Sequence, residues 1–307
     1  MLWIPVTLAA ATCQILRTSR QHELRCVLST SAAGFVRYAY GAPLALVTSA
    51  MVFGLLGRPI PHIPGRFWPT VIGAGVAQIV ATVALLQSFK MRDFAVGTVY
   101  SKSEVLIVAG MGAVGLGTAI EPAGWLGIVL VTVGVVALAS QGSWRTVLQA
   151  SGLQASRLQA SGDPAALMGI VAAAGFAAAA VGIGSASKSL TGAASFDRAL
   201  CTLTVMLTVQ TLINAAWFAV ADPRQIRLVA AAWRPAMWVG VFSLLGSIGW
   251  AWGFTLESAA KVRTLGQVEL VIAFVIARVT LGERHRRADY LASALVLAGV
   301  VVVTVLG

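Results

Sequence analysis

Residues Phe89–Val136 read FKMRDFAVGTVYSKSEVLIVAGMGAVGLGTAIEPAGWLGIVLVTVGVV, and residues Phe254–Val301, 165 positions later, read FTLESAAKVRTLGQVELVIAFVIARVTLGERHRRADYLASALVLAGVV. The two stretches align without a gap, and roughly a quarter of the aligned positions are identical. Glu104 falls on Glu269 in this alignment. A duplicated apolar pattern with one acidic residue at the same position of each copy is typical of many secondary transporters.

The composition of the chain indicates a membrane protein. Of the 307 residues, 58% are hydrophobic and 11% are charged, whereas about 25% are charged in an ordinary soluble domain. A soluble protein this apolar could not cover its own surface. The net charge of +11 is explained by arginines in the short loops of a membrane protein, so we expect no nucleic-acid partner.

The chain contains about ten apolar runs, most of them of roughly 17–25 residues, which is long enough to cross a bilayer. Because lipid offers backbone groups no water to bond, and because the runs are long and unbroken, we expect helices rather than a barrel. The fold class is therefore predicted to be all-α integral membrane, with about ten transmembrane helices. The runs cover residues 2–16, 32–56, 67–89, 94–116, 123–139, 165–186, 198–220, 235–256, 259–281 and 290–306.

The midpoint of the chain is marked by a repeated pentad. Residues 148–162 read LQASGLQASRLQASG, and a stretch of such small and polar residues is typical of a linker. We therefore expect a first five-helix repeat over residues 1–140, a linker over 141–163 and a second five-helix repeat over 164–307. The first run lacks a basic start and a cleavage site, so it is predicted to be a retained span.

The positive charges favour one orientation in the membrane. Thirteen arginines and lysines fall in the loops that follow odd-numbered spans, and at most six fall on the other side. Because cytoplasmic loops carry the excess of positive charge, this distribution places both termini outside.

The two acidic residues of the repeat, Glu104 and Glu269, are the first candidates for function. Each lies about ten residues into its predicted span, where a carboxylate is costly and usually faces the protein interior or a wet cavity. One interpretation is that they bind a proton or the amine of a ligand. The alternative is a fixed hydrogen bond or ion pair that holds two helices together.

Other polar residues lie close to these acids in the sequence. Tyr100 and Lys102 share a predicted helix with Glu104, and Gln267 aligns with Lys102. Residues two apart point to nearly opposite sides of a helix, so Lys102 is not expected to pair with Glu104. We expect the acids, rather than Lys102 and Gln267, to face the cavity.

Amide and aromatic side chains complete the candidate substrate site. Gln14 and Gln78 can bond a polar ligand, although an interhelical hydrogen bond is the alternative for each. Trp252, with Trp250 and Tyr100, can form an aromatic wall against a planar or cationic ligand; an interfacial anchor is the alternative. Arg263 lies near a span end, and we expect it to extend toward the lipid headgroups.

Motifs for catalysis, metals and nucleotides are absent from the sequence. No span carries a Ser/His/Asp or Cys/His constellation, and no GxxxxGK[ST] motif is present. The three cysteines and three histidines follow no zinc or disulfide spacing. The chain is therefore predicted to be no enzyme and to hold no cofactor and no metal.

Three short motifs in the second copy resemble a known family. RTLGQVE over Arg263–Glu269, LGER over Leu281–Arg284 and LAGVV over Leu297–Val301 resemble the closing signature of EamA-type carriers of the drug/metabolite transporter superfamily. The first copy departs from it, since Thr118 stands at the position of Glu283. The resemblance implies two inverted five-helix repeats around a central cavity, and alternating access. It also implies cytoplasmic termini, contrary to the distribution of arginines.

Pattern and resemblance together predict a secondary transporter of the cytoplasmic (inner) membrane, a multi-pass protein that exports small amino-acid-like or drug-like metabolites. Coupling to protons is one alternative for its energy source. Its partners would be a small-molecule substrate and the lipid bilayer, with a homodimer left open. The rival functions are a passive facilitator or channel, and an integral-membrane enzyme.

Overall fold

The structure is a computed structural model that describes residues 1–24, 28–91, 103–115, 121–139, 164–272 and 287–306. All regular secondary structure in these residues is helical, apart from one isolated bridge between His62 and Thr191. Five described helices are long and apolar enough to cross a membrane. This part of the prediction is confirmed: the described part of the chain is all-α, with several candidate membrane spans.

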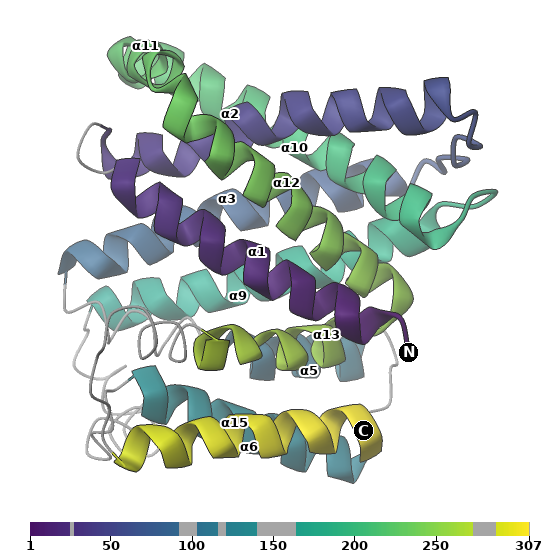
Figure 1. The fold of residues 1–307 in the computed structure, drawn as a ribbon, viewed down its shortest axis with the longest axis vertical. Helices are drawn as coiled ribbons and strands as arrows, with labels where there is room; N and C mark the ends of the chain where they lie inside the picture. Colours follow the sequence, from purple (N-terminus) through teal and green to yellow (C-terminus); the bar gives the residue numbers. More distant parts are fainter. Residues whose placement is uncertain (25–27, 92–102, 116–120, 140–163, 273–286, 307) are drawn as a thin grey trace. The chain divides into compact units, whose positions relative to one another are not determined.

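The helices follow the predicted apolar runs closely (Figure 1). They are α1 (Trp3–Glu23), α2 (Thr30–Ser49), η2 (Ala50–Leu55), α3 (Phe67–Met91), α5 (Glu104–Gly115), α6 (Pro122–Ala139), α9 (Pro164–Ser189), α10 (Ser195–Ala221), α11 (Pro223–Ala231), α12 (Trp233–Leu256), α13 (Ala259–Gly266) and α15 (Arg287–Leu306). The structure differs from the prediction at three places. α1 continues to Glu23, seven residues past the predicted run over 2–16. A short helix, α11, replaces a predicted loop, and the run predicted over 259–281 is interrupted after Gly266.

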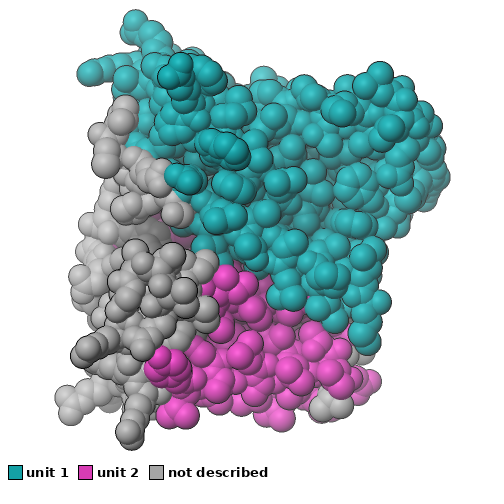
Figure 2. All heavy atoms as spheres, in the orientation of Figure 1, with its two compact units in different colours: residues 1–79, 179–257 teal, residues 80–178, 258–307 magenta. Residues whose placement is uncertain are grey.

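The chain divides into two compact units (Figure 2). Unit 1 contains Met1–Ile79 and Ala179–Glu257, and unit 2 contains Val80–Ala178 and Ser258–Gly307. Each unit thus takes residues from both of the predicted sequence repeats. The division of the sequence into repeats at 1–140 and 164–307 stays a prediction.

In unit 1, α1 packs against α12, and α2 packs against both α10 and α12. Glycines make these approaches close. A Cβ atom on Gly249 would lie 2.8 Å from the Cβ of Ala10, and a Cβ atom on Gly240 would lie 2.6 Å from the Cβ of Tyr40. Lipid supplies no hydrophobic drive for helix association, so dispersion contacts between closely packed backbones stabilise the bundle instead.

In unit 2, α6 and α15 form the corresponding close pair. A Cβ atom on Gly299 would lie 2.6 Å from the carbonyl oxygen of Gly127, and one on Gly134 would lie 2.8 Å from that of Ala292. The later residue of α6 meets the earlier residue of α15, so the two helices are antiparallel. The two contacts also correspond to each other in the sequence alignment. Gly127 aligns with Ala292 and Gly134 with Gly299, each pair 165 residues apart.

The 165-residue offset recurs in the bounds of the helices. α10 begins at Ser195, 165 residues after the start of α2 at Thr30, and α15 begins at Arg287, 165 residues after the start of α6 at Pro122. α3 ends at Met91, and α12 ends 165 residues later. One bound of each of these three helix pairs therefore keeps the 165-residue offset of the sequence alignment.

Candidate functional site

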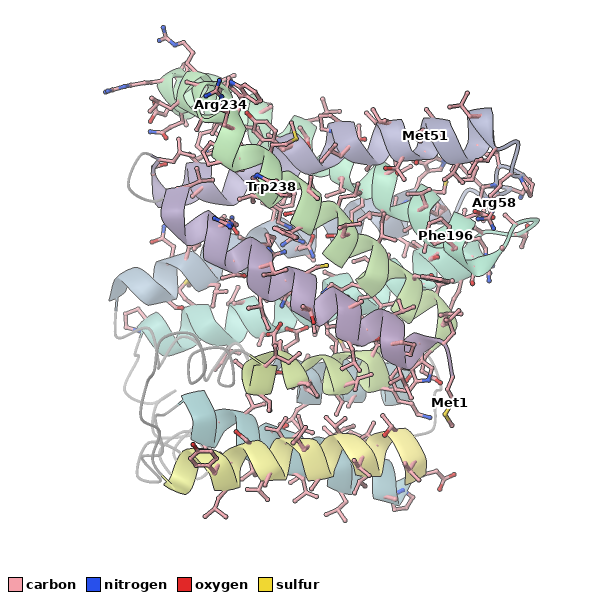
Figure 3. All side chains as sticks on the ribbon, in the orientation of Figure 1. Met1, Met51, Arg58, Phe196, Arg234 and Trp238 are labelled. Atoms are coloured by element: carbon pink, nitrogen blue, oxygen red, sulfur yellow. The ribbon has the colours of Figure 1, made fainter. Side chains whose placement is uncertain are left out.

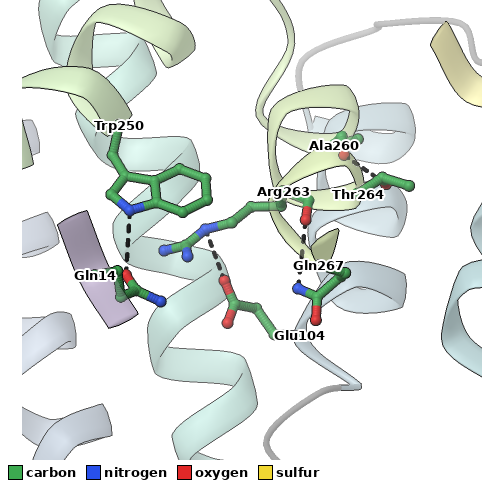
Figure 4. A network of polar contacts seen from close by, with 7 residues as sticks. All are labelled: Gln14, Glu104, Trp250, Ala260, Arg263, Thr264 and Gln267. Carbon is green, nitrogen blue, oxygen red and sulfur yellow. Dashed lines mark hydrogen bonds and ion pairs between the residues drawn. The ribbon is translucent and has the colours of Figure 1, made fainter. Parts of the chain in front are cut away.

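The strongest candidate site is a buried ion pair in unit 2. The Nε atom of Arg263 lies 2.8 Å from the Oε1 atom of Glu104, and the two side chains are only 13% and 9% exposed (Figure 4). Glu104 comes from α5 and Arg263 from α13, two helices that pack against each other. The pair thus joins the two copies of the sequence through opposite charges.

Both charges occupy ends of helices that favour them. Glu104 is the first residue of α5, where the carbonyl oxygen of Ser103 accepts the N–H groups of Leu106 and Ile107. Arg263 lies in the last turn of α13. A carboxylate is stabilised near the positive N-terminus of a helix, and a cation near the negative C-terminus. The helix ends therefore offset part of the cost of burying two charges.

The helix that carries Arg263 is short for local reasons. It begins at Ala259, after Ser258, whose side chain accepts the N–H of Lys261. It ends at Gly266, a residue with low helix propensity. The N–H of Gln267 then bonds the carbonyl of Thr264, and the N–H of Leu270 bonds that of Gln267. These three-residue spacings tighten the backbone into a turn, and helical conformation resumes at residue 268.

Gln267 lies at this interruption and is 4% exposed. Its Nε2 group donates to the carbonyl of Arg263 over 3.3 Å (Figure 4). Among the described residues its Oε1 atom has no hydrogen-bond partner. A buried amide oxygen without a donor is costly, so this atom is a ready acceptor for an N–H or O–H group of a ligand.

Of the two predicted acids, only Glu104 is buried in the described structure. Glu269 is half-buried in the helical stretch after Gln267 and makes contacts of its own. The expectation that Arg263 extends toward the headgroups does not hold in this structure, because its side chain turns to Glu104. Sequence reasoning therefore missed Arg263 as a site residue. The available signal was its place in the second copy, six residues before Glu269.

Tyr100 and Lys102 lie outside the described residues, so their predicted roles stay predictions. The remaining candidates, Gln14, Gln78 and Trp252, all belong to unit 1. Each of the three makes a contact to another helix or its end.

Gln14 and Gln78 bond other helices. The Oε1 atom of Gln14, in α1, accepts the indole N–H of Trp250, in α12, over 3.1 Å (Figure 4). The Oε1 atom of Gln78, in α3, accepts from the Nε2 group of Gln210, in α10, over 2.9 Å. Gln210 also donates to the carbonyl of Gly75 over 3.1 Å. These bonds match the interhelical alternative for both glutamines.

Trp252 lies in a cluster at the start of α10. Its indole N–H donates to the hydroxyl of Ser195 over 3.1 Å, and its ring meets that of Phe196 edge to face. The guanidinium of Arg58 lies over the ring of Phe196, 5.8 Å from its centroid, and 3.1 Å from the carboxylate of Asp197. Trp252 therefore joins α12 to the start of α10. Arg58 contacts the same turn of α10 through Phe196 and Asp197 (Figure 3).

The arrangement in unit 2 suits a ligand with charges of its own. A carboxylate can compete with Glu104 for the guanidinium of Arg263, and an ammonium group can compete with Arg263 for Glu104. Both side chains of the pair are mostly buried, and an interaction between charges is stronger there than in water. Nothing in this donor set favours a metal, since a guanidinium repels a cation.

No protein-family model matches the chain, and no curated protein matches it. Its fold is similar to that of solved structures. One crystal structure, described only as that of a protein, has a TM-score of 0.70 and covers 99% of this chain and 96% of its own, at 13% sequence identity. At that identity the similarity concerns the fold alone.

Proposed function

We propose that the chain is a secondary transporter, of the type to which EamA carriers belong, that exports small polar metabolites by alternating access. The observation that carries the proposal is the buried pair of Glu104 and Arg263, 2.8 Å apart, beside an interrupted helix in an apolar bundle. Charged groups inside membrane segments mark substrate or ion pathways. The helix of Arg263 is also broken at one residue, Gln267, whose buried amide oxygen has no hydrogen-bond partner among the described residues.

The repeat supports the same proposal. Gly127 contacts Gly299, and Gly134 contacts Ala292. Replacing each residue by its counterpart 165 positions away turns the first contact into the second. A rotation that exchanges two antiparallel helices is perpendicular to them, and for helices that cross a bilayer such an axis lies in the membrane plane. This is the symmetry of inverted repeats. The proposal therefore includes ten spans in two inverted halves, in the cytoplasmic membrane.

The substrate acts, in this proposal, by opening the ion pair. Breaking a buried pair without replacement costs about 3–5 kcal/mol, so an empty carrier keeps Glu104 on Arg263. A ligand that offers both a carboxylate and an ammonium group satisfies both partners, and its remaining N–H or O–H group can bond Gln267. Such a ligand has differential affinity for the opened state, which is what drives a change between two conformations.

A ligand screen followed by transport tests the proposal. Purified protein in mild detergent would be heated with amino acids, polyamines, nucleosides, sugars and cationic dyes, because a ligand at about a hundred times its dissociation constant adds roughly 2.7 kcal/mol of stability. Each hit would then be tested for exchange between labelled substrate inside and unlabelled substrate outside proteoliposomes. Accelerated exchange supports a carrier. Single-channel currents would support the channel alternative, and a chemically altered substrate would support the enzyme alternative.

Matched variants connect the transport to the site. Glu104→Gln and Arg263→Gln should each abolish the ligand shift, and Glu121→Gln, at an exposed acid beside α6, should leave it unchanged. The double variant, Glu104→Gln with Arg263→Gln, serves as the folding control because it leaves no unpaired charge. Exchange at the wild-type rate in a folded double variant would overturn the role of the pair.

A further inference from the structure

The α11 end of unit 1 carries a basic surface that the proposed transport function does not use. α11 is nine residues long and follows Asp222 directly. Arg224 and Arg227, three residues apart, are both exposed and therefore share one face of the helix. Arg234, exposed in the first turn of α12, adds a third guanidinium (Figure 3). Asp222 is the one nearby carboxylate in the described segment 222–234.

The opposite face of α11 is fixed to the protein. Val229 is 3% exposed, and its carbonyl oxygen accepts the hydroxyl of Tyr40, in α2, over 3.0 Å. The side chain of Gln225 accepts the N–H of Ser29, the N-cap residue of α2, over 3.4 Å. α11 contacts α2, α10 and α12. The two arginines are thus presented outward from a helix that is held in place.

The direction of α11 differs from that of the spanning helices. Figure 1 shows α11 almost end-on, whereas α2, α10 and α12 of the same unit run across the view. When those helices cross the bilayer, α11 therefore lies along the membrane surface. It is located where α10 ends and α12 begins, because only one residue separates it from each.

Exposed tryptophans place the same level of the protein at the lipid headgroups. Trp217, in the last turns of α10, is 67% exposed, and Trp233 and Trp238, in the first turns of α12, are 54% and 57% exposed. Indole rings at span ends are enriched at the membrane–water interface. The guanidinium of Arg234 lies over the ring of Trp233, 5.5 Å from its centroid. With these rings at the interface, the arginines would lie at the height of the lipid phosphates.

From this arrangement we infer that α11 and the start of α12 form a binding site for an anionic phospholipid. Guanidinium groups bind phosphate oxygens in a bidentate way, and basic clusters at span ends attract anionic lipid. Two exposed arginines on one face and a third beside Trp233 can hold one phosphate and a net negative headgroup. The site fixes the height of unit 1 in the bilayer.

The test uses the full chain in mild detergent with phosphatidylglycerol or phosphatidylcholine of the same acyl chains, and counts bound lipid by native mass spectrometry. Wild-type protein should retain phosphatidylglycerol preferentially. The triple variant R224Q/R227Q/R234Q should bind it about a hundredfold more weakly, since each arginine near an anionic surface contributes roughly fivefold. R66Q, which removes an exposed arginine just before α3, should bind it as the wild type does.

Three further measurements decide the interpretation. R224K/R227K/R234K keeps the charge and should retain most of the preference. Raising the salt from about 0.1 M to 1 M should weaken wild-type binding, because the screening length falls from roughly 10 Å to 3 Å. Equal retention of the two lipids, or an unchanged preference in the folded glutamine variant, would overturn the inference. So would soluble glycerol phosphate that competes as well as the lipid does, because the site would then bind free phosphate.

Discussion

The close approach of α6 and α15 makes a quantitative prediction about Gly299. In Gly299→Ala, the new Cβ atom would lie 2.6 Å from the carbonyl oxygen of Gly127 and 2.7 Å from the backbone nitrogen of Val131. Both neighbours are backbone atoms, which cannot rotate away. To reach the 3.4 Å of an ordinary contact the helices must separate by roughly 0.8 Å, and a gap of that size forfeits about a quarter to a half of the dispersion energy of each contact.

The expected loss of stability is about 1–3 kcal/mol, the usual cost of overpacking by one small group. Gly134→Ala should cost about as much, because its Cβ atom would lie 2.8 Å from the carbonyl oxygen of Ala292 and from the nitrogen of Val296. Gly73→Ala is the matched control, since nothing lies within 4 Å of its Cβ position. That variant should be as stable as the wild type, or more stable by about 0.5–1 kcal/mol through helix propensity.

The measurement is unfolding of the purified full chain by increasing SDS in mixed micelles, followed by tryptophan fluorescence. The reasoning requires Gly299→Ala and Gly134→Ala to unfold at lower SDS fractions than Gly73→Ala. If all three alanine variants unfold together, α6 and α15 do not meet through these backbone atoms. If Gly299→Ala alone is destabilised, the two halves of the contact are not equivalent.

Three other predictions concern polar contacts, and each is checked by the same SDS titration. Glu104→Gln should lower the stability by about 3–5 kcal/mol because it leaves the guanidinium of Arg263 buried without its counter-charge. If Glu104→Gln loses less stability than the double variant Glu104→Gln/Arg263→Gln, this reasoning is contradicted. Gln210→Leu removes the 2.9 Å bond to Gln78 and should cost about 0.6–2 kcal/mol, whereas a neutral result would mean that the bond contributes nothing in the membrane. Trp250→Phe keeps an aromatic ring but loses the indole N–H that α1 accepts over 3.1 Å, so about 0.5–1.5 kcal/mol should be lost, and an unchanged midpoint would argue against that bond.

Most of the helical pattern could be predicted from the sequence, because it depends on local hydrophobicity. The predicted run 67–89 corresponds to α3, Phe67–Met91, and the run 235–256 to α12, Trp233–Leu256. α11 was missed because its nine residues are too polar for a span. Its formation depends on Pro223 at the first turn and on the burial of Val229 against other helices, which only the folded chain provides.

The candidate site could be predicted only in part, because its residues come from segments far apart in the sequence. Glu104 stood out as a carboxylate in an apolar run, and it is buried as expected. For its partner Arg263 the sequence predicts a place at the headgroups, because an arginine at a span end can extend to the lipid headgroups as its nearest polar environment. The tertiary contact of α13 with α5 offers a closer and stronger partner.

The sequence by itself determined the membrane class, the helical content and the 165-residue recurrence, because these follow from the order of apolar and small residues along the chain. Only the tertiary structure decided how the polar residues are used. Gln78 bonds Gln210 rather than standing alone, and Glu104 meets Arg263. The physical reason is that a polar side chain in an apolar bundle takes whichever partner the helix crossings bring within reach.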